Sequence, residues 1–168
     1  MNATELRNLQ APLKEKYKAE PSAAIVTLKA SGKIGEGISC KVETGRAITE
    51  AGLHPASGGN GLLACSGDML LEALVACAGV TLQAVATAIG IEIKDGTVRA
   101  EGDLDFRGTL GVSKEVAVGF TVIRLSFDLD SNATDEQMAS LAKLTERYCV
   151  VYQTLVKGVT VETRFQTV

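Results

Sequence analysis

The chain has 168 residues, a net charge of -3, 46% apolar residues and 22% charged residues. This length predicts one folded domain over residues 1–168, of which residues 1–21 form an N-terminal helical extension. The acidic balance and an aromatic content of only 4% argue against nucleic acid and anionic membrane surfaces as partners. The polar N-terminus lacks the apolar core of a signal peptide, so we expect a cytoplasmic protein.

The first fifty residues predict a helix followed by strands. Residues 4–18 carry apolar side chains at helical spacing and predict a short amphipathic helix. Residues 25–30 and 38–42 are predicted strands, and the glycine-rich residues 31–37 between them suit a hairpin loop. A third extended piece is expected at residues 47–49.

A long apolar helix is predicted in the middle of the chain. The glycine-rich residues 52–68 are expected to form a surface loop that leads into a helix over residues 68–89. Ser66 or Asp68 would cap the start of this helix, and Gly90 stands where its end is expected. Because the segment is interrupted by polar residues and is rich in Ala and Gly, we predict a buried core helix and no membrane span.

The second half of the chain predicts a hairpin, a helix and a closing strand. Residues 97–107 and 116–129 alternate apolar and polar side chains and should pair as a long hairpin. A capping-box pattern begins at Thr134, and apolar residues then recur at helical spacing, which predicts one helix over residues 134–157. Residues 159–165 alternate again and predict a final strand.

This order of elements predicts an α+β domain built in layers. The helix over residues 68–89 is apolar on every face, and a single sheet can cover only one side of it. Its other side therefore needs the second long helix or a partner subunit. A homodimer follows as a hypothesis.

Most kinds of catalytic site have little support in the sequence. The single histidine, His54, lies in the predicted loop, and we expect it to hydrogen-bond locally instead of serving a nucleophile. One histidine without a Cys-x-x-Cys pair predicts no metal site. No glycine-rich phosphate-binding motif joins a strand to a helix, so no nucleotide cofactor is expected. Cysteine chemistry remains.

Cys77 and Cys149 lie in the two long predicted helices. Small residues flank Cys77 and let another backbone come close, while Cys149 lies at the edge of the apolar stripe of its helix. Both fit one helix–helix contact, where a disulfide requires Cα atoms about 4.4–6.8 Å apart. Simple core packing is the alternative, because free cysteine often behaves as a small buried hydrophobe. We expect that role for Cys40 and Cys65.

Two segments resemble the OsmC/Ohr family. SGDMLLEALVACAGVTL is similar to the family's first cysteine-bearing helix, and LTERYCVVYQTL is similar to its second. The resemblance extends over residues 22–168 and is carried by these two helices. It implies an OsmC-like fold, in which antiparallel sheets pack on two central helices within an intertwined homodimer.

The resemblance also implies a function, a thiol-dependent peroxidase that reduces organic hydroperoxides. Cys77 matches the family's peroxidatic cysteine and Cys149 its resolving cysteine. A Cys77 thiolate would attack the peroxide, and a Cys77–Cys149 disulfide would close through a sulfenic acid. The implied partners are a small-molecule peroxide, a dithiol or lipoyl-type reductant and a second subunit, with no cofactor. A noncatalytic OsmC-like protein that senses redox state or binds a hydrophobic ligand is the alternative.

A thiolate at Cys77 needs a source of stabilisation. The pKa of free cysteine is about 8.5, and Cys77 lies too far into its helix to benefit from the helix dipole. Lys33 stands where family peroxidases carry an activating arginine, so we expect Arg46 to supply the cation, with a solvated strand end as its alternative role. Asp68 matches the family's acidic position, and helix capping would explain it equally well. The chain reads Cys149-Val150-Val151 where relatives often have Cys-Pro-Val.

Overall fold

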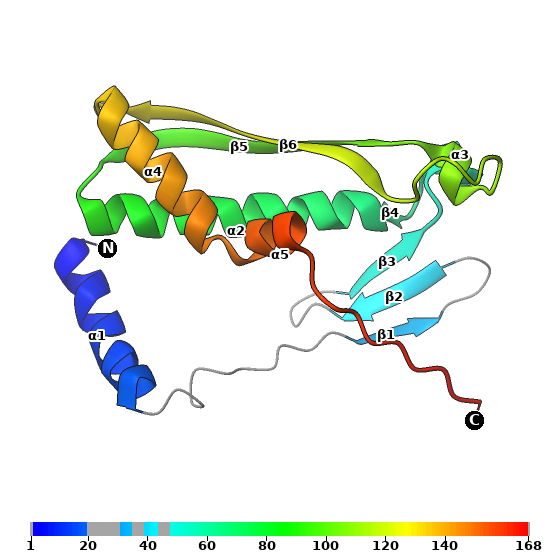
Figure 1. Cartoon of the computed structure of the whole chain (residues 1–168), viewed down its shortest axis with the longest axis horizontal. Helices are drawn as coiled ribbons and strands as arrows, with labels where there is room; N and C mark the ends of the chain where they lie inside the picture. Colours follow the sequence, from blue (N-terminus) through cyan, green and yellow to red (C-terminus); the bar gives the residue numbers. More distant parts are fainter. Residues whose placement is uncertain (1, 20–30, 35–38, 44–47, 168) are drawn as a thin grey trace.

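A computed structural model describes residues 2–19, 31–34, 39–43 and 48–167 (Figure 1). Helix α1 (Ala3–Ala19) confirms the predicted N-terminal helix and contacts α2. The strand predicted at residues 25–30 lies outside the described residues.

A four-stranded sheet follows α1, in the order β1-β2-β3-β4. Its strands are β1 (Ser31–Ile34), β2 (Ser39–Glu43), β3 (Ile48–Gly52) and β4 (Ala64–Cys65). The first four residues of the predicted glycine-rich loop therefore form strand β1. The first three strands pair antiparallel, but β4 pairs with β3 in parallel. The expectation of purely antiparallel sheets is wrong here, because the connection from β3 carries the chain back so that β4 runs in the same direction.

The connection between β3 and β4 is a loop that contains the 3-10 helix η2 (Pro55–Ser57). His54 caps this turn, because its Nδ1 accepts the N–H of Ala56 at 3.0 Å. Its ring stacks on Phe106 with the ring centroids 5.2 Å apart. The local structural role predicted for His54 is confirmed.

Helix α2 (Ser66–Ile89) confirms the predicted long helix. Cys65 is its N-cap residue and makes no side-chain capping hydrogen bond, so the prediction that Ser66 or Asp68 caps the helix is wrong. Asp68 lies in the first turn, where a carboxylate favours the positive end of the helix dipole. Gly90 ends the helix with φ 77°, a conformation that glycine adopts without steric cost.

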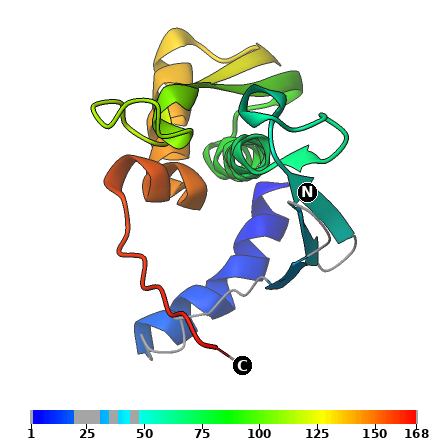
Figure 2. The same cartoon turned by 90° about the vertical axis from the view of Figure 1, so that its right-hand side faces the viewer.

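Helix α2 contacts five other elements of the described chain. Figure 2 views it nearly end-on, and it contacts β4, β5, α1, α4 and α5. By length and composition it is apolar enough to cross a membrane. In the single chain 28% of its most apolar stretch is buried, so the predicted core helix stays an expectation. Part of its surface remains uncovered, since the side chain of Val80 is 73% exposed.

A long antiparallel hairpin covers one side of α2. Strands β5 (Ile93–Leu104) and β6 (Phe120–Ser131) confirm the predicted pair, and helix α3 (Phe106–Thr109) lies in their connection. The inward side chains of β6 include apolar residues that pack on the helices. The outward face carries ion pairs such as Arg124 with Asp103, 2.6 Å apart. An antiparallel sheet with one face on the core and the other in solvent typically has this apolar inner face and polar outer face.

Two helices complete the core, α4 (Asp135–Tyr148) and α5 (Val150–Lys157). The predicted capping box at the start of α4 is confirmed: Thr134 and Gln137 exchange hydrogen bonds between side chain and backbone. A core cluster joins α4 to α2 and to the residue Ile91 just after α2. Its members are Leu82, Val85, Ala86, Ile91 and Leu141. The prediction of one continuous helix over residues 134–157 is wrong, because the helix is interrupted at Cys149, which separates α4 from α5.

The C-terminal residues 158–167 form no helix or strand. A closing strand was predicted there from the alternation of Val159, Val161 and Phe165, and this prediction is wrong for the single chain. The side chain of Phe165 is 95% exposed. An alternating segment becomes a strand only when a neighbouring strand accepts its backbone hydrogen bonds, and neither sheet of the described chain pairs with it.

Candidate active site

The break between α4 and α5 is centred on Cys149, whose backbone is extended at φ -72° and ψ 110°. Its N–H still donates to the carbonyl of Thr145 at 2.9 Å, and its carbonyl accepts the N–H of Gln153 at 2.9 Å. Thus α4 ends and α5 begins at the same residue. The first N–H groups of any helix have no partner within that helix. The break therefore frees backbone N–H groups immediately after Cys149.

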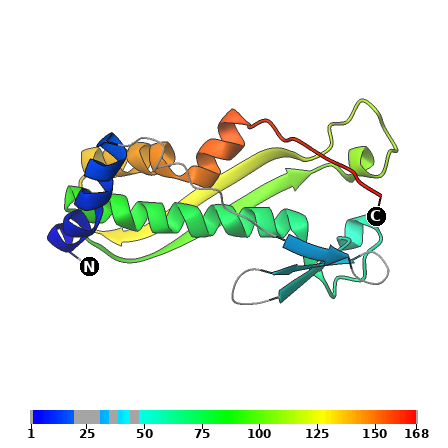
Figure 3. The same cartoon turned by 90° about the horizontal axis from the view of Figure 1, so that it is seen from below.

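A side chain from α5 reaches back across this break. The amide nitrogen of Gln153 donates to the carbonyl of Glu146 at 2.8 Å, which satisfies one of the open carbonyls at the end of α4. Figure 3 shows α5 beside α2, and the two helices are in contact. The freed N–H groups thus lie on the side of α2 that carries Cys77.

The groups around Cys77 include some of these N–H groups. The backbone N–H groups of Val151 and Val150, the Cys149 thiol and the Thr81 hydroxyl all act to lower the pKa of the Cys77 thiol. Cys77 therefore lies at the N-terminus of α5, although it belongs to α2. Backbone N–H groups at a helix start, together with the positive end of the helix dipole, stabilise an anion.

These contacts decide the acidity of Cys77. Burial by itself would raise the pKa of its thiol. The hydrogen bonds from Val151, Cys149, Val150 and Thr81 outweigh the burial, and the pKa of Cys77 lies below its ordinary value. Cys77 is accordingly the thiol of this pair that ionises first.

Cys149 has the opposite character. Its side chain is 1% exposed, and burial raises the pKa of its thiol. The neighbouring Cys77 adds to this increase, while the N–H groups of Tyr152 and Val151 oppose it without cancelling it. With its pKa raised, Cys149 is the thiol of this pair that ionises last. Cys77 and Cys149 are both free thiols in the structure.

The other residues singled out in the sequence lie elsewhere. Arg46 is outside the described residues. Lys33 is a residue of β1 that pairs with Lys41 of β2. Asp68 precedes Cys77 by more than two turns of α2, roughly 14 Å along the helix axis, so its carboxylate is too far away to contact the sulfur.

Cys65 lies too far along α2 to join the pair. Cys65 caps the start of α2, and Cys40 belongs to β2. From Cys65 to Cys77 is more than three turns of helix, roughly 18 Å. A disulfide between these two is therefore sterically excluded within the chain, since it requires Cα atoms no more than about 7 Å apart.

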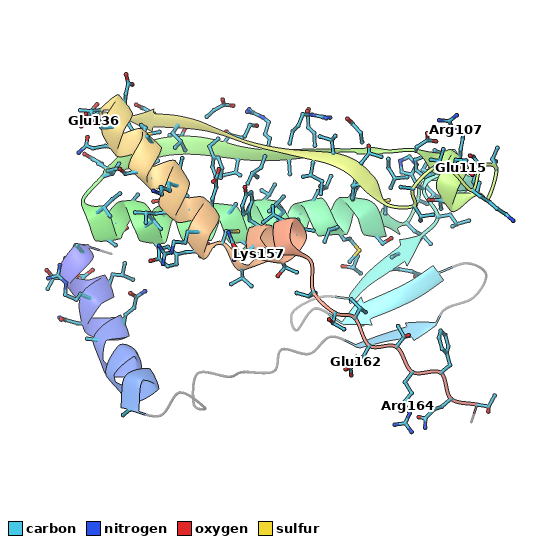
Figure 4. All side chains as sticks on the ribbon, in the orientation of Figure 1. Arg107, Glu115, Glu136, Lys157, Glu162 and Arg164 are labelled. Atoms are coloured by element: carbon cyan, nitrogen blue, oxygen red, sulfur yellow. The ribbon has the colours of Figure 1, made fainter. Side chains whose placement is uncertain are left out.

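No positively charged side chain among the described residues contributes to the pKa of Cys77. Figure 4 shows charged side chains toward the two ends of the hairpin: Glu136 at the start of α4, and Arg107 with Glu115 near the connection between β5 and β6. Lys157 ends α5 and lines a surface hollow together with Val150. Nor do the described residues contain a cluster of His, Cys, Asp or Glu able to hold a metal ion. Within the described residues, backbone N–H groups of α5 and the uncharged side chains of Cys149 and Thr81 are thus the groups that stabilise the Cys77 thiolate.

The sequence predicted the two cysteines but missed the donors around Cys77. Backbone N–H groups leave no trace in side-chain patterns, and the break at Cys149 contains neither Pro nor Gly. The only local sign is the β-branched pair Val150 and Val151, which lowers helix propensity slightly. Thr81 was open to prediction, because a residue four positions after Cys77 lies on the same face of a helix.

The comparisons with known proteins decide the family. The family model described as OsmC-like protein matches residues 59–164, from the loop before α2 to the C-terminal segment. The chain belongs to the OsmC-like family. The resemblance predicted from the two cysteine-bearing helices is confirmed, and the match begins later than the predicted residue 22.

Solved structures of OsmC-like proteins share this fold. An OsmC-like protein from Mycoplasma pneumoniae aligns with a TM-score of 0.66 and 17% identity, covering 80% of this chain and 89% of that one. An organic hydroperoxide resistance protein from Elizabethkingia anophelis aligns with a TM-score of 0.63 and 18% identity, covering 80% and 91%. No curated protein sequence matches the chain significantly. The α+β OsmC-like fold is confirmed.

The influence of the Val150 N–H on the pKa of Cys77 can be tested by substitution. We expect Val150→Pro to shift the ionisation of Cys77 to higher pH, because proline at the first helical position removes the N–H that Val150 donates to the sulfur. Proline fits this position: Cys149 is already extended, as a residue before proline prefers, and the first position of a helix tolerates proline. The measurement is the rate of Cys77 alkylation by iodoacetamide as a function of pH.

The matched control is Val150→Ala, which shortens the side chain but keeps the N–H. Its pH profile should coincide with that of the unmodified protein, whose Cys77 reacts as a thiolate at lower pH than an ordinary cysteine. Equal profiles for Val150→Pro and Val150→Ala would show that the backbone donor has no influence on Cys77.

Proposed function

We propose that this OsmC-like protein is a thiol-dependent peroxidase that reduces organic hydroperoxides through Cys77 and Cys149. The observation that carries the proposal is the asymmetry of the pair: the pKa of Cys77 is lowered by hydrogen bonds from the start of α5, while the pKa of the adjacent Cys149 is raised by burial. Peroxide reduction needs one thiolate to attack and one thiol to resolve. Structural relatives described as organic hydroperoxide resistance proteins support the same chemistry.

In the first step, the Cys77 thiolate attacks the terminal oxygen of the hydroperoxide ROOH. The O–O bond breaks, a sulfenic acid forms on Cys77, and the alkoxide RO⁻ leaves and takes up a proton as the alcohol ROH. The sulfur is oxidised by two electrons and the peroxide is reduced by two. The N–H groups of Val150 and Val151 hold the thiolate in place for this attack.

In the second step, the Cys149 sulfur attacks the sulfenic acid and loses its proton. The S–O bond of the sulfenic acid breaks, a Cys77–Cys149 disulfide forms, and the hydroxide combines with that proton as water. A dithiol then reduces the disulfide to two thiols and becomes a disulfide itself. We propose a dithiol or lipoyl-type compound for this role in a reducing, cytoplasmic compartment.

Arg46 remains our proposed source of an additional cation near Cys77. It would act together with the α5 backbone, whose N–H groups supply no full charge. Asp68 is proposed to serve α2 through the helix dipole, given its distance from the sulfur.

The function is tested by steady-state turnover. The full chain is mixed with excess cumene hydroperoxide and excess dihydrolipoamide, and the loss of peroxide is followed over time. The proposal predicts many turnovers per protein molecule. Oxidation that stops after one equivalent of peroxide would contradict it and would support the noncatalytic redox-sensing alternative.

We also propose that the chain forms a homodimer through the uncovered face of α2. Leu70 and Val80 are exposed large apolar side chains on this helix, and exposed alanines lie between them. Apolar residues on the surface of a single chain are typical of a site covered by a partner. The unpaired, alternating C-terminal segment is a further surface that a second copy can cover.

Val80→Glu is expected to convert the dimer to a monomer, because it places a charge in the proposed interface. The variant should still fold, since Val80 is 73% exposed in the single chain. Light scattering after size-exclusion chromatography measures the mass. The control is Ser126→Glu on the polar outer face of β6, which should stay dimeric. A dimer that survives Val80→Glu unchanged contradicts this interface.

A further inference from the structure

An apolar cavity of about 530 Å³ lies on β6, next to Cys149. Its lining comes from four elements: β6 supplies Ile123, Leu125 and Phe127, α2 supplies Leu74, and α4 and α5 supply residues on either side of the helix break. Binding sites for small molecules typically enclose about 300–1,000 Å³ and are mostly apolar. The cavity therefore has the size and the lining of a site for a small apolar molecule.

One buried polar group in the lining lacks a partner. Thr145 is 3% exposed, and its Oγ1 makes no hydrogen bond within the described part of the chain. Buried hydroxyl groups are nearly always hydrogen-bonded, because an unpaired one forfeits its interaction with water. A ligand with an oxygen atom beside Thr145 would satisfy this hydroxyl.

The charge of the lining selects among such ligands. Among the described residues that line the cavity, Glu146 is the only charged one, and no lysine or arginine is present. A carboxylate ligand would be repelled by Glu146 and would lose its hydration without a compensating cation. An uncharged oxygen group, such as a hydroxyl or a carbonyl, meets neither penalty.

From this geometry we propose that the cavity binds an uncharged single-chain aliphatic molecule, a long-chain alcohol or carbonyl compound, whose oxygen hydrogen-bonds to Thr145. Cys149 lines the cavity, whereas Cys77 is not among the lining residues. Leu74 and Ala78, near Cys77 on α2, also line the cavity, so it adjoins the cysteine pair without being lined by the Cys77 sulfur. The inference stands whether or not the chain is a peroxidase.

The test uses the reduced full chain in its natural oligomeric state. The fluorescence of N-phenyl-1-naphthylamine, an uncharged apolar probe, reports occupancy, and 1-decanol and decanoate compete for the site at neutral pH. We expect saturable probe binding that 1-decanol displaces. Decanoate should compete at least about tenfold less well, since its charge must be buried beside Glu146.

Two variants locate the bound molecule. Leu125→Trp fills the cavity and should abolish probe binding, with circular dichroism and the Cys77 alkylation rate confirming that the chain still folds. Thr145→Val keeps the shape of the side chain and removes only the hydroxyl. This substitution should lower the affinity for 1-decanol by about threefold to tenfold, while the affinity for the probe stays the same. Thr154→Val, at an exposed position on α5, is the matched control and should change neither affinity.

Three results would overturn the proposal. A dimer that binds no probe would show that a second copy of the chain already fills the cavity. Equal probe binding by folded Leu125→Trp and the unmodified protein would place the probe elsewhere. Decanoate competing as well as 1-decanol would rule out selection for an uncharged group. Repeating the titration with Cys77→Ser tests ligand binding separately from the peroxidase proposal, because binding requires no turnover.

Discussion

Cys77→Ser is expected to lower the rate of organic hydroperoxide reduction more than about a thousandfold, the scale of loss seen when an enzyme's nucleophile is removed. A serine hydroxyl does not ionise near neutral pH, so the N–H groups of Val150 and Val151 would have no anion to stabilise. The measurement is peroxide consumption at saturating dithiol. Full turnover by Cys77→Ser would contradict the proposed nucleophile.

Cys149→Ser and Cys65→Ser are the informative companions. Cys149→Ser should still attack one equivalent of peroxide and then stop at a sulfenic acid on Cys77, which dimedone traps and mass spectrometry detects. Cys65→Ser should behave like the unmodified protein, because Cys65 lies more than three helical turns from Cys77. Loss of activity in Cys65→Ser would indicate a different pairing of the cysteines.

Leu141→Ala is expected to lower the free energy of unfolding by about 2–5 kcal/mol, the usual cost of truncating a buried leucine. Leu141 is 1% exposed and packs in the cluster that joins α4 to α2. Its truncation leaves a cavity in the cluster that joins α4 to α2. Urea unfolding followed by circular dichroism measures the effect, with all variants at one protein concentration because a dimer's stability depends on it.

The control for this prediction is Leu110→Ala, which makes the same chemical change at an exposed position in the connection between β5 and β6. Its cost should stay within about 0.5 kcal/mol. If both variants lowered the free energy of unfolding equally, the burial of Leu141 in the core cluster would not contribute to stability.

The elements with strong local signals were predictable from the sequence. The hairpin of β5 and β6 follows from period-two alternation, and α2 from its length and its closing Gly90. The start of α4 follows from the capping box at Thr134. In each case the residues that determine the element lie within it or next to it, so no distant contact had to be known.

The helix break at Cys149 was not predictable in the same way. The apolar stripe continues across it from α4 into α5, and Cys149 carries none of the backbone constraints of Pro or Gly. What the break provides becomes visible only when α2 is packed beside it, since the acceptor of the freed N–H groups is a sulfur on another helix. The sequence indicated a cation for Cys77 at Arg46, which lies outside the described residues, and the structure adds uncharged groups on α2, α5 and Cys149 that the sequence did not indicate.

The remaining errors also concern contacts between distant segments. Nothing local shows that β4 pairs with β3 in parallel. The alternation of residues 159–165 is typical of a strand, but a strand needs a neighbour, and the described chain supplies none. The candidate site was predicted as far as its two cysteines, while the groups that set their pKa values and the cavity beside Cys149 depend on the packing of four elements.

The most direct test of the cysteine pair is to add one equivalent of cumene hydroperoxide to the fully reduced protein and map its disulfides by mass spectrometry. We expect a rapidly formed Cys77–Cys149 bond that is absent from both Cys77→Ser and Cys149→Ser. Thiols that remain untouched, or a disulfide that involves Cys40 or Cys65 instead, would contradict the assignment of Cys77 and Cys149 as the redox pair.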